Sequence, residues 1–391
     1  MIGRVKIALV VFGTRPEAIK LWPVIRALRA SGEYRVVSCS TGQHRDLVEP
    51  VSALFSETSD YDLKIMRPGQ SLTYVAAAVA EGVAGVIKNE SPDICLVQGD
   101  TTTAFAAALS AFYCRVPVAH VEAGLRTGDM ASPWPEEGNR VMISRLADYH
   151  FAPTAAAERN LLAEGADPER VFLTGNTVVD AALHVQALIA SGHRNPERRF
   201  SGVDAEAPVI LFTMHRRESF GGPMERVFRA LQQFCVTHNV QVLFPMHPNP
   251  SVRRAAQDIL GSQPNVHLCD PLDYDELIYM LGRCRFVITD SGGLVEEAPS
   301  FGKPVLVLRD TTERPESVEA GCAILCGADP ARMTSLADEL LKDGRLFRSM
   351  ASTPNPYGDG RAAERIAACL TNAGNNRPSR PSNIEHLGRA M

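Results

Sequence analysis

The chain has 391 residues, of which 45% are hydrophobic and 22% are charged, and its formal net charge is −5. This length is too great for one ordinary hydrophobic core and suits two domains of ordinary size. The composition is typical of a soluble globular protein, and the absence of a basic excess argues against nucleic acid or an anionic membrane as the main partner.

The first part of the chain alternates apolar strands with helices. We predict strands at residues 6–12, 34–40, 94–97, 118–121, 149–151 and 171–173. One helix is predicted with Pro16 in its first turn and residue 28 at its end, and a second is predicted after Arg45, ending at residue 55. Further helices are predicted at 73–88, 102–113 and 155–164, and after Pro135. Residues 60–70, with Pro and Gly, are predicted to be irregular. Strict alternation indicates a parallel sheet covered on both faces, so we expect an N-terminal domain at residues 1–178.

A second alternating set follows a predicted crossover helix at residues 178–189. Its strands are predicted at residues 209–213, 240–245, 266–268, 286–289 and 305–308, which gives a C-terminal domain at residues 179–357. The fold class is therefore α/β, with two Rossmann-like domains facing a cleft that is lined by strand ends. A last helix at residues 358–371 is expected to pack back on the first domain, and residues 372–391 are expected to form a disordered tail.

A glycine-rich turn and several basic residues follow predicted strands. Residues 291–293 read Ser-Gly-Gly at the start of a helix, where glycine lets backbone N–H groups approach an anion and the helix dipole favours negative charge. Basic residues on strand-end loops are Arg15, His215, Arg216, Arg217 and Arg314. Together they predict a diphosphate site, with Glu297 placed for the ribose hydroxyls. The alternatives are solvated loop charges and an ordinary tight turn.

Three carboxylates are candidates for acid/base chemistry in the N-terminal domain. Asp100 and Glu122 each follow a strand, and Glu136 lies in the first turn of a helix, so all three are expected to face the cleft. Asp100 could instead cap the helix at 102–113, and Glu136 could instead answer a helix dipole.

No cofactor or metal is expected. The G-x-G-x-x-G fingerprint is missing after the first strand, which disfavours a nicotinamide dehydrogenase. Nine cysteines without a CxxC pair indicate reduced thiols and a cytoplasmic protein, and Cys322 and Cys326 lack the Cys/His partners of a zinc site. No apolar run is long enough to span a membrane, and residues 7–12 lead into a turn, unlike a signal peptide.

These motifs, in order, closely resemble the non-hydrolysing bacterial UDP-N-acetylglucosamine 2-epimerases from residue 6 to about residue 370. The motifs are FGTRPEAIK, QHR, QGDTTT, HVEAGLRTG, SPWPEEGNR, TGNTVVD, HRRESFG, TDSGGLVEEAPSFGKPVLVLRDTTERPE and NPYGDG. The resemblance implies the two-domain glycosyltransferase-B fold, a homodimer, and interconversion of UDP-GlcNAc and UDP-ManNAc for surface polysaccharide synthesis.

The resemblance also implies roles for individual residues. The catalytic set is Asp100, Glu122, Glu136 and His215. The substrate-binding set is Arg15, Lys20, Leu272, Leu277, Ser291, Gly292, Gly293, Glu297 and Arg314. A second, activating UDP-GlcNAc site is implied near Gln43, His44, Arg67, Gln70, Arg216 and His247.

The implied reaction eliminates UDP to form 2-acetamidoglucal and then adds UDP back after protonation of the opposite face. Two faces require two proton-handling groups, and the sequence does not assign the acids to faces. The rivals are a glycosyltransferase of the same fold and a non-catalytic nucleotide-sugar sensor.

The chain departs from the family pattern at the uracil end of the nucleotide. Leu272 stands where members usually have Gln, and Leu277 replaces an aromatic residue, so we expect side-chain recognition of uracil to be weaker by about 1 kcal/mol.

Overall fold

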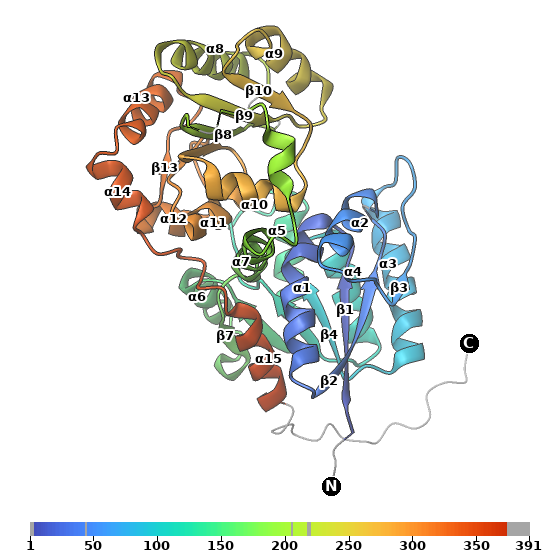
Figure 1. Cartoon of the computed structure of the whole chain (residues 1–391). Helices are drawn as coiled ribbons and strands as arrows, with labels where there is room; N and C mark the ends of the chain where they lie inside the picture. The colour runs from blue at the N-terminus through green and yellow to red at the C-terminus, as the bar shows by residue number, and fades with distance from the viewer. Residues whose placement is uncertain (1–3, 44, 205, 217–219, 374–391) are drawn as a thin grey trace.

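The computed structural model describes residues 4–43, 45–204, 206–216 and 220–373, and these contain two parallel β-sheets (Figure 1). The first sheet has seven strands in the order β3-β2-β1-β4-β5-β6-β7. They are β1 (Lys6–Phe12), β2 (Tyr34–Ser40), β3 (Tyr61–Asp62), β4 (Ile94–Gln98), β5 (Val118–Val121), β6 (Tyr149–Ala152) and β7 (Val171–Leu173). Strand β3 corrects the irregular assignment of residues 60–70, because it pairs with the end of β2 opposite Cys39 and Ser40.

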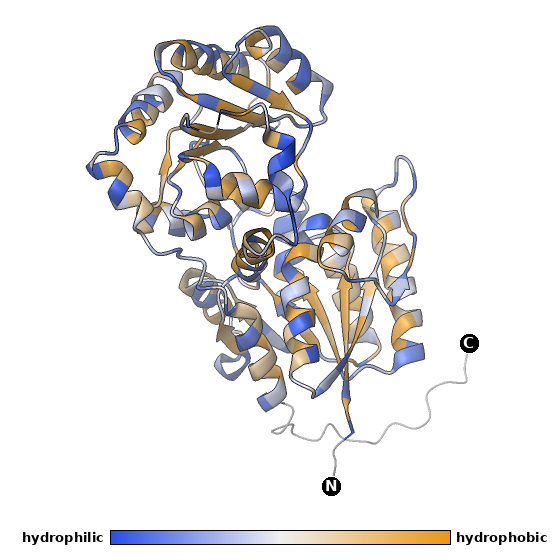
Figure 2. Ribbon diagram, in the orientation of Figure 1, coloured by the Kyte–Doolittle hydropathy of each residue, from blue (hydrophilic) through white to orange (hydrophobic). Residues whose placement is uncertain are grey.

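Alternate side chains of β1 reach opposite faces of this sheet. Ala8 and Val10 belong to a hydrophobic cluster with α1, whereas Leu9 and Val11 belong to another with α3 and α4. The helices here are α1 (Arg15–Ala30), α2 (Arg45–Leu54), α3 (Leu72–Glu90), α4 (Thr102–Tyr113), α5 (Glu136–Leu146), α6 (Ala155–Ala163) and the short η1 (Pro168–Arg170). The sheet and these helices form the N-terminal lobe, whose strands are apolar along most of their length (Figure 2).

The second sheet has six parallel strands in the order β10-β9-β8-β11-β12-β13. They are β8 (Val209–Thr213), β9 (Gln241–Pro245), β10 (Val266–Cys269), β11 (Phe286–Thr289), β12 (Val305–Val307) and β13 (Ala323–Leu325). Strand β13 is not predicted from the sequence, because a run of three residues carries no periodicity, yet it pairs with β12 along its whole length.

Helices on both faces of the second sheet complete the C-terminal lobe. They are α8 (Gly222–Thr237), α9 (Pro250–Leu260), α10 (Tyr274–Arg283), α11 (Gly292–Glu297), α12 (Pro315–Ala320), α13 (Pro330–Leu341) and α14 (Arg345–Ala351), with the 3-10 helices η2 (Pro196–Phe200) and η4 (Ala298–Phe301). Helices α8, α9 and α13 pack on one face, and α10 and α11 contribute to the cluster that continues into the N-terminal lobe.

The two lobes are joined by α7 (Thr177–Ala190) and by the segment at residues 353–359. Helix α7 contacts α1 in one lobe and α10 and α11 in the other (Figure 1). The segment at 353–359 leads to α15 (Ala362–Ala373), which packs against α1 and α7. Tyr34 Oη donates to the carbonyl of Leu370 at 3.0 Å, and Asp180 on α7 accepts from the backbone N–H of Ala362 and Ala363. The last helix is therefore tied to α7 at its N-terminal end and to β2 of the N-terminal lobe near its C-terminal end.

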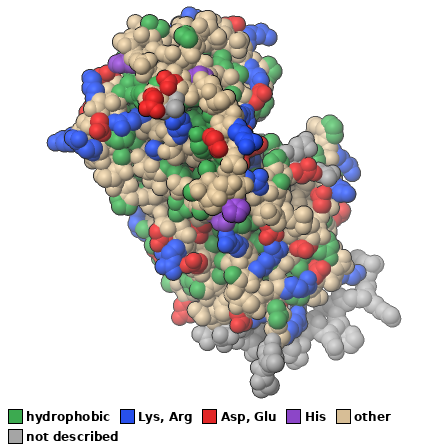
Figure 3. Space-filling model, in the orientation of Figure 1, with side chains coloured by type: hydrophobic (Ala, Val, Ile, Leu, Met, Phe, Trp, Pro, Cys, Tyr) green, Lys and Arg blue, Asp and Glu red, His purple; other side chains and the backbone are tan. Residues whose placement is uncertain are grey.

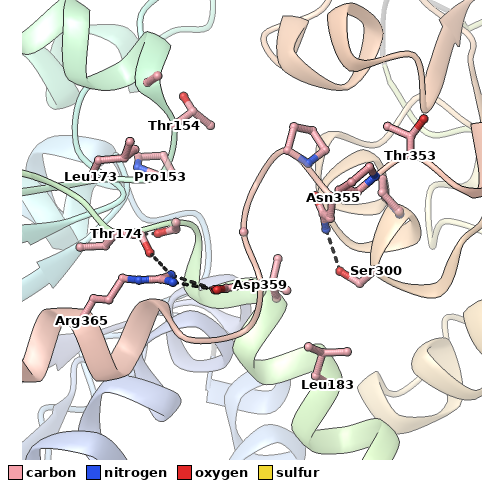
Figure 4. Close-up of a pocket in the computed structure, with 17 residues that line it drawn as sticks. Pro153, Thr154, Leu173, Thr174, Leu183, Ser300, Thr353, Asn355, Asp359 and Arg365 are labelled. Carbon is pink, nitrogen blue, oxygen red and sulfur yellow. Dashed lines mark hydrogen bonds and ion pairs between the residues drawn. The ribbon is translucent and has the colours of Figure 1, made fainter.

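A cavity of about 830 Å³ lies beside these crossings (Figure 4). In this cavity, which we call the rear cavity, Arg365 pairs with Asp359 and donates to the carbonyl of Thr174. Its walls come from both lobes and from the segment at 353–359.

The surface in Figure 3 has acidic and basic side chains interspersed over both lobes, as the small net charge of −5 leads one to expect. None of the helices among the described residues has the length and apolar character needed to cross a bilayer.

Candidate active site

A cavity of about 700 Å³ lies between the lobes at the C-terminal ends of strands of both sheets, and we call it the cleft cavity. Ligands of open parallel sheets bind at this edge. The predicted residues that line it are Arg15, Lys20, His215, Arg216, His247, Leu272, Leu277, Ser291, Gly292, Gly293, Glu297 and Arg314. The structure thus brings together residues that lie up to 299 positions apart in the chain, between Arg15 and Arg314.

The Ser-Gly-Gly turn leads from β11 into α11, and Ser291 is the residue before the helix. Neither Gly292 nor Gly293 has a positive φ, since neither is among the left-handed glycines. A Cβ atom on Gly292 would lie 3.6 Å from the Arg314 guanidinium carbon, an ordinary contact distance. The fold therefore tolerates a small side chain at these positions, so the tight turn by itself does not require glycine there. This argues against the alternative of an ordinary tight turn.

The loop after β8 is held by Asp290, which the sequence analysis did not single out. Its Oδ2 accepts the backbone N–H groups of His215 and Arg216 at 2.8 Å each, and His215 Nδ1 lies 2.9 Å from Oδ1. Burial acts to raise the pKa of Asp290, but the hydrogen bond and charge of His215 outweigh burial, so the pKa is lowered. Arg217 lies outside the described residues.

The imidazole of His247 stacks on that of His215, with ring centres 5.8 Å apart. Burial and the neighbouring His215 lower the pKa of His247, so this ring is neutral near pH 7. The two histidines form one wall of the cleft cavity.

Four charged side chains meet at the base of the cleft, and we call them the charge quartet: Lys20, Glu122, Glu296 and Arg314. Lys20 Nζ lies 2.5 Å from Glu122 Oε2 and 3.1 Å from Glu296 Oε2, and Arg314 Nε lies 2.7 Å from Glu296 Oε1. Glu296 was missed because the pattern LVEE makes Glu297 look like the functional acid, although both are buried.

Charges in the quartet shift one another's proton affinities. Burial acts to lower the pKa of Lys20, but Glu122 and Glu296 outweigh it, so the lysine stays charged. Burial raises the pKa of Glu122 against the attraction of Lys20, and the charge of Glu296 raises it further. Burial also acts to raise the pKa of Glu296, but Lys20 and Arg314 outweigh it and the pKa is lowered. Glu122 is therefore the acid of the quartet that most readily carries a proton.

The backbone at Glu122 is unusual, with φ of +62°. A glutamate in the left-handed region costs free energy, and such outliers concentrate at functional sites. Its Oε2 also accepts from Gln98 Nε2 at 2.7 Å, so the carboxylate is fixed from two sides.

None of the three acids expected to face the cleft is among the residues that line the cleft cavity, and Glu122 is connected to it through Lys20. Asp100 Oδ2 pairs with Arg140 at 2.8 Å, and the cap of α4 is the neighbouring Thr101, whose side chain accepts from Ala104. The capping alternative for Asp100 is therefore wrong. Glu136 is the first residue of α5 and is partly exposed. This position also suits the alternative in which Glu136 only interacts with the dipole of the helix that it begins.

The predicted uracil end is tied to the N-terminal lobe. Arg15 Nη2 donates to the carbonyl of Leu272 at 3.0 Å, and the Leu272 side chain is buried in the hydrophobic cluster while Leu277 is partly exposed. Tyr274, which the sequence analysis missed, donates to Glu297 Oε1 at 2.9 Å. Burial raises the pKa of Glu297 to about 7, with the charge of Glu296 adding to the rise.

Residues of the implied second site fall into two groups. Gln43, Arg67 and Gln70 belong to the N-terminal lobe, where Gln43 accepts from Thr103 and the Arg67 guanidinium lies 4.5 Å from the Tyr74 ring centre. Arg216 and His247 line the cleft cavity in the other lobe. His44 lies outside the described residues.

Among the described residues, no group of three or more His, Cys, Asp or Glu side chains is arranged to hold a metal ion.

Comparisons with known proteins agree with this architecture. The family model described as UDP-N-acetylglucosamine 2-epimerase matches residues 26–371. The UDP-N-acetylglucosamine 2-epimerase of Escherichia coli K12 is 47% identical over 368 residues, covering 93% of this chain and 98% of that protein.

Solved structures match over nearly the whole chain. The Neisseria meningitidis UDP-GlcNAc 2-epimerase bound to UDP-GlcNAc is 42% identical with a TM-score of 0.88, covering 94% of this chain and 100% of that one. The Methanocaldococcus jannaschii enzyme in complex with UDP-GlcNAc and UDP is 32% identical with a TM-score of 0.78, covering 94% and 99%. The resemblance seen in the motifs is confirmed, and the chain belongs to the UDP-N-acetylglucosamine 2-epimerase family.

Proposed function

We propose that this protein catalyses the reversible conversion of UDP-GlcNAc to UDP-ManNAc. The observation that carries the proposal is the cleft cavity, where basic residues and the Ser-Gly-Gly turn of the C-terminal lobe meet Lys20 of the N-terminal lobe, which in turn pairs with the buried Glu122. An anion site beside a buried acid is what elimination of a diphosphate requires.

The first half-reaction is elimination. The C1–O bond to UDP breaks, the C2 proton leaves to a carboxylate, and a C1=C2 double bond forms, which gives 2-acetamidoglucal and UDP. Arg15, His215, Glu297 and Arg314 line the cleft cavity, and we expect the three basic residues to stabilise the leaving diphosphate and Glu297 to hold the ribose. Return of a proton to the opposite face of C2 and of UDP to C1 completes the inversion.

The acids differ in what supports them. Glu122 has the raised pKa, the left-handed backbone and the contact with Lys20 that suit a proton-transfer group. Asp100 is held by the buried Arg140, and Glu136 starts the helix that carries Arg140. We propose that two of these three handle the two faces of C2, with the pairing left to experiment.

Several further properties belong to the same proposal. A homodimer, a second activating site and a role in surface polysaccharide synthesis follow from the family resemblance. A cytoplasmic location is supported by nine cysteines that are all free thiols. Uracil recognition through Leu272 and Leu277 rests on their place in the lining of the cleft cavity.

Product analysis tests the proposal directly. Purified protein is incubated with UDP-GlcNAc, and the anomeric protons are followed by NMR. We expect UDP-ManNAc to appear and the mixture to reach the same composition from either sugar nucleotide. Transfer of the sugar to an added acceptor, without any epimer, would instead identify a glycosyltransferase.

A further inference from the structure

Glu296 is a buried carboxylate inside a site that is built for an anion. Its side chain is 1% exposed and lines the cleft cavity. One oxygen accepts from Lys20 of the N-terminal lobe, and the other accepts from Arg314 of the C-terminal lobe. A carboxylate here repels a diphosphate by its charge, so its presence calls for a function that outweighs this cost.

The main chain of the same residue reaches the other side of the lobe junction. The carbonyl of Glu296 accepts from Asn355 Nδ2 at 2.9 Å. Asn355 belongs to the returning segment at 353–359, and its Nδ2 also donates to Ser300 Oγ at 2.7 Å beside the rear cavity (Figure 4). Glu296 thus links the base of the cleft to a chain crossing between the lobes.

The charge quartet balances two cations with two carboxylates. Without Glu296, Lys20 would keep Glu122 as its one carboxylate of the quartet, and Arg314 would keep only its contact with Glu313 at 3.3 Å, outside the quartet. Both cations are nearly buried, and buried charges of one sign without partners are costly. The carboxylate of Glu296 therefore fixes where both cations lie before substrate arrives.

We infer that Glu296 is a positioning residue of the epimerase, which holds Lys20 of one lobe and Arg314 of the other in fixed places across the cleft. The inference rests on the proposed function and deepens it. Glu296 acts through the other members of the quartet, and its charge opposes UDP binding while its geometry supports turnover.

Other ionisable groups face this carboxylate. They are Lys20 on α1, Glu122 after β5, Arg314 before α12, Glu297 on α11, Tyr274 on α10 and Tyr357 in the segment at 353–359. Burial is the largest cause of the raised pKa of Glu122, and the Glu296 charge adds to it against Lys20 and Arg314. Removing the Glu296 charge leaves Glu122 with both cations, so the pKa of Glu122 falls.

The test compares Glu296→Gln with Glu319→Gln, a matched change at an exposed residue of α12. For Glu296→Gln we expect UDP to bind about three- to tenfold tighter by calorimetry, because an anion has left the site. We expect kcat to fall about tenfold or more, because the cations lose their fixed placement. We also expect one limb of the pH–rate profile of Glu296→Gln to move to lower pH. Glu319→Gln should change neither the UDP affinity nor kcat nor the pH–rate profile.

Glu296→Asp keeps the charge and guards against misfolding of the neutral variant. Because aspartate is too short to contact both cations, we expect kcat to fall while UDP affinity stays within about twofold of the native value. The inference would be overturned if Glu296→Asp kept the full native kcat. It would also be overturned if Glu296→Gln bound UDP no tighter than the native protein and had the native pH–rate profile. If native protein binds UDP without epimerising UDP-GlcNAc, the proposed function fails, and the UDP affinities of the variants still test the role of Glu296.

Discussion

At the scale of single residues, Glu122 combines a strained backbone with a buried, paired carboxylate. The left-handed φ and the bonds from Lys20 and Gln98 hold it in one orientation. A left-handed φ alone does not mark a site, because Ser56, Lys64, Ser91, Arg115 and Asp343 have one too, but in Glu122 it is combined with a buried and paired carboxylate. We therefore rank Glu122 first among the proton-transfer groups.

Neutral replacements of the three acids test this ranking. Asp100→Asn, Glu122→Gln and Glu136→Gln should each lower kcat by at least about a hundredfold while UDP affinity is retained, as loss of a general acid or base predicts. Steady-state kinetics and calorimetry provide both values, with Glu81→Gln on the exposed side of α3 as the control. A folded variant with near-native turnover would remove that acid from the mechanism.

The buried Glu297 makes stability depend on pH. Burial raises its pKa from 4.5 to about 7, which corresponds to about 3 kcal/mol at full ionisation. The pKa of Glu297 is higher in the folded protein than in the unfolded chain. The contribution of this carboxyl group to the free energy of unfolding is therefore complete below pH 4.5 and is lost as the pH rises through 7. Glu297→Gln removes this titration. The melting temperature of the variant minus that of the native protein should therefore increase between pH 5 and pH 8.5. A difference that does not vary with pH would contradict the raised pKa.

At the scale of elements, much of the architecture could be predicted from the sequence. Apolar runs such as residues 6–12 and 209–213 identify core strands, and their ends locate the turns that lead to Arg15 and His215. The very short β3 and β13 could not be predicted, because their pairing depends on neighbours far along the chain.

The site was harder to predict where function depends on contacts between lobes. The sequence points to Arg15, Lys20 and Arg314 through their motifs, and these residues line one cavity. It does not point to Glu296, Asp290 or Tyr274, because their importance comes from the side chains they meet after folding. Adjacent acids such as Glu296 and Glu297 cannot be told apart by composition.

The loop between β10 and α10 carries the departure from the family pattern at Leu272. Its carbonyl is occupied by Arg15 and its side chain is buried among apolar residues, so an amide there would also lose apolar packing. We expect the native protein to prefer UDP over TDP, and Leu272→Gln to tighten UDP by no more than a few-fold. Calorimetry with both nucleotides measures this, and equal affinities in the native protein would place UDP specificity in doubt.

At the scale of the whole molecule, the proposed reaction needs the two lobes to exclude water from the glycal that we propose as its intermediate. The lobes meet through polar contacts such as Arg15 to Leu272 and Lys20 to Glu296, and chain crossings lie beside the rear cavity. The lobes also share the apolar cluster that runs from α1 through α7 to α10 and α11. We therefore expect domain closure around a ligand to change the polar contacts at the cleft, which rearrange more readily than apolar packing.

Closure is measurable by small-angle scattering. Saturating UDP-GlcNAc should reduce the radius of gyration, because binding energy draws both lobes onto the substrate. The same titration with uridine, which lacks the diphosphate, is the control and should change the radius less. A constant radius with bound UDP-GlcNAc would contradict closure.

The central claim, elimination of UDP from C1 with loss of the C2 proton followed by the reverse addition, is tested most directly in deuterated water. Native protein is incubated with UDP-GlcNAc, and the C2 position of both sugar nucleotides is followed by NMR. The proposed reaction removes the C2 proton to a carboxylate that exchanges with solvent, so UDP-ManNAc should carry deuterium at C2 from the first turnovers. Formation of UDP-ManNAc that retains the original C2 proton would contradict the mechanism.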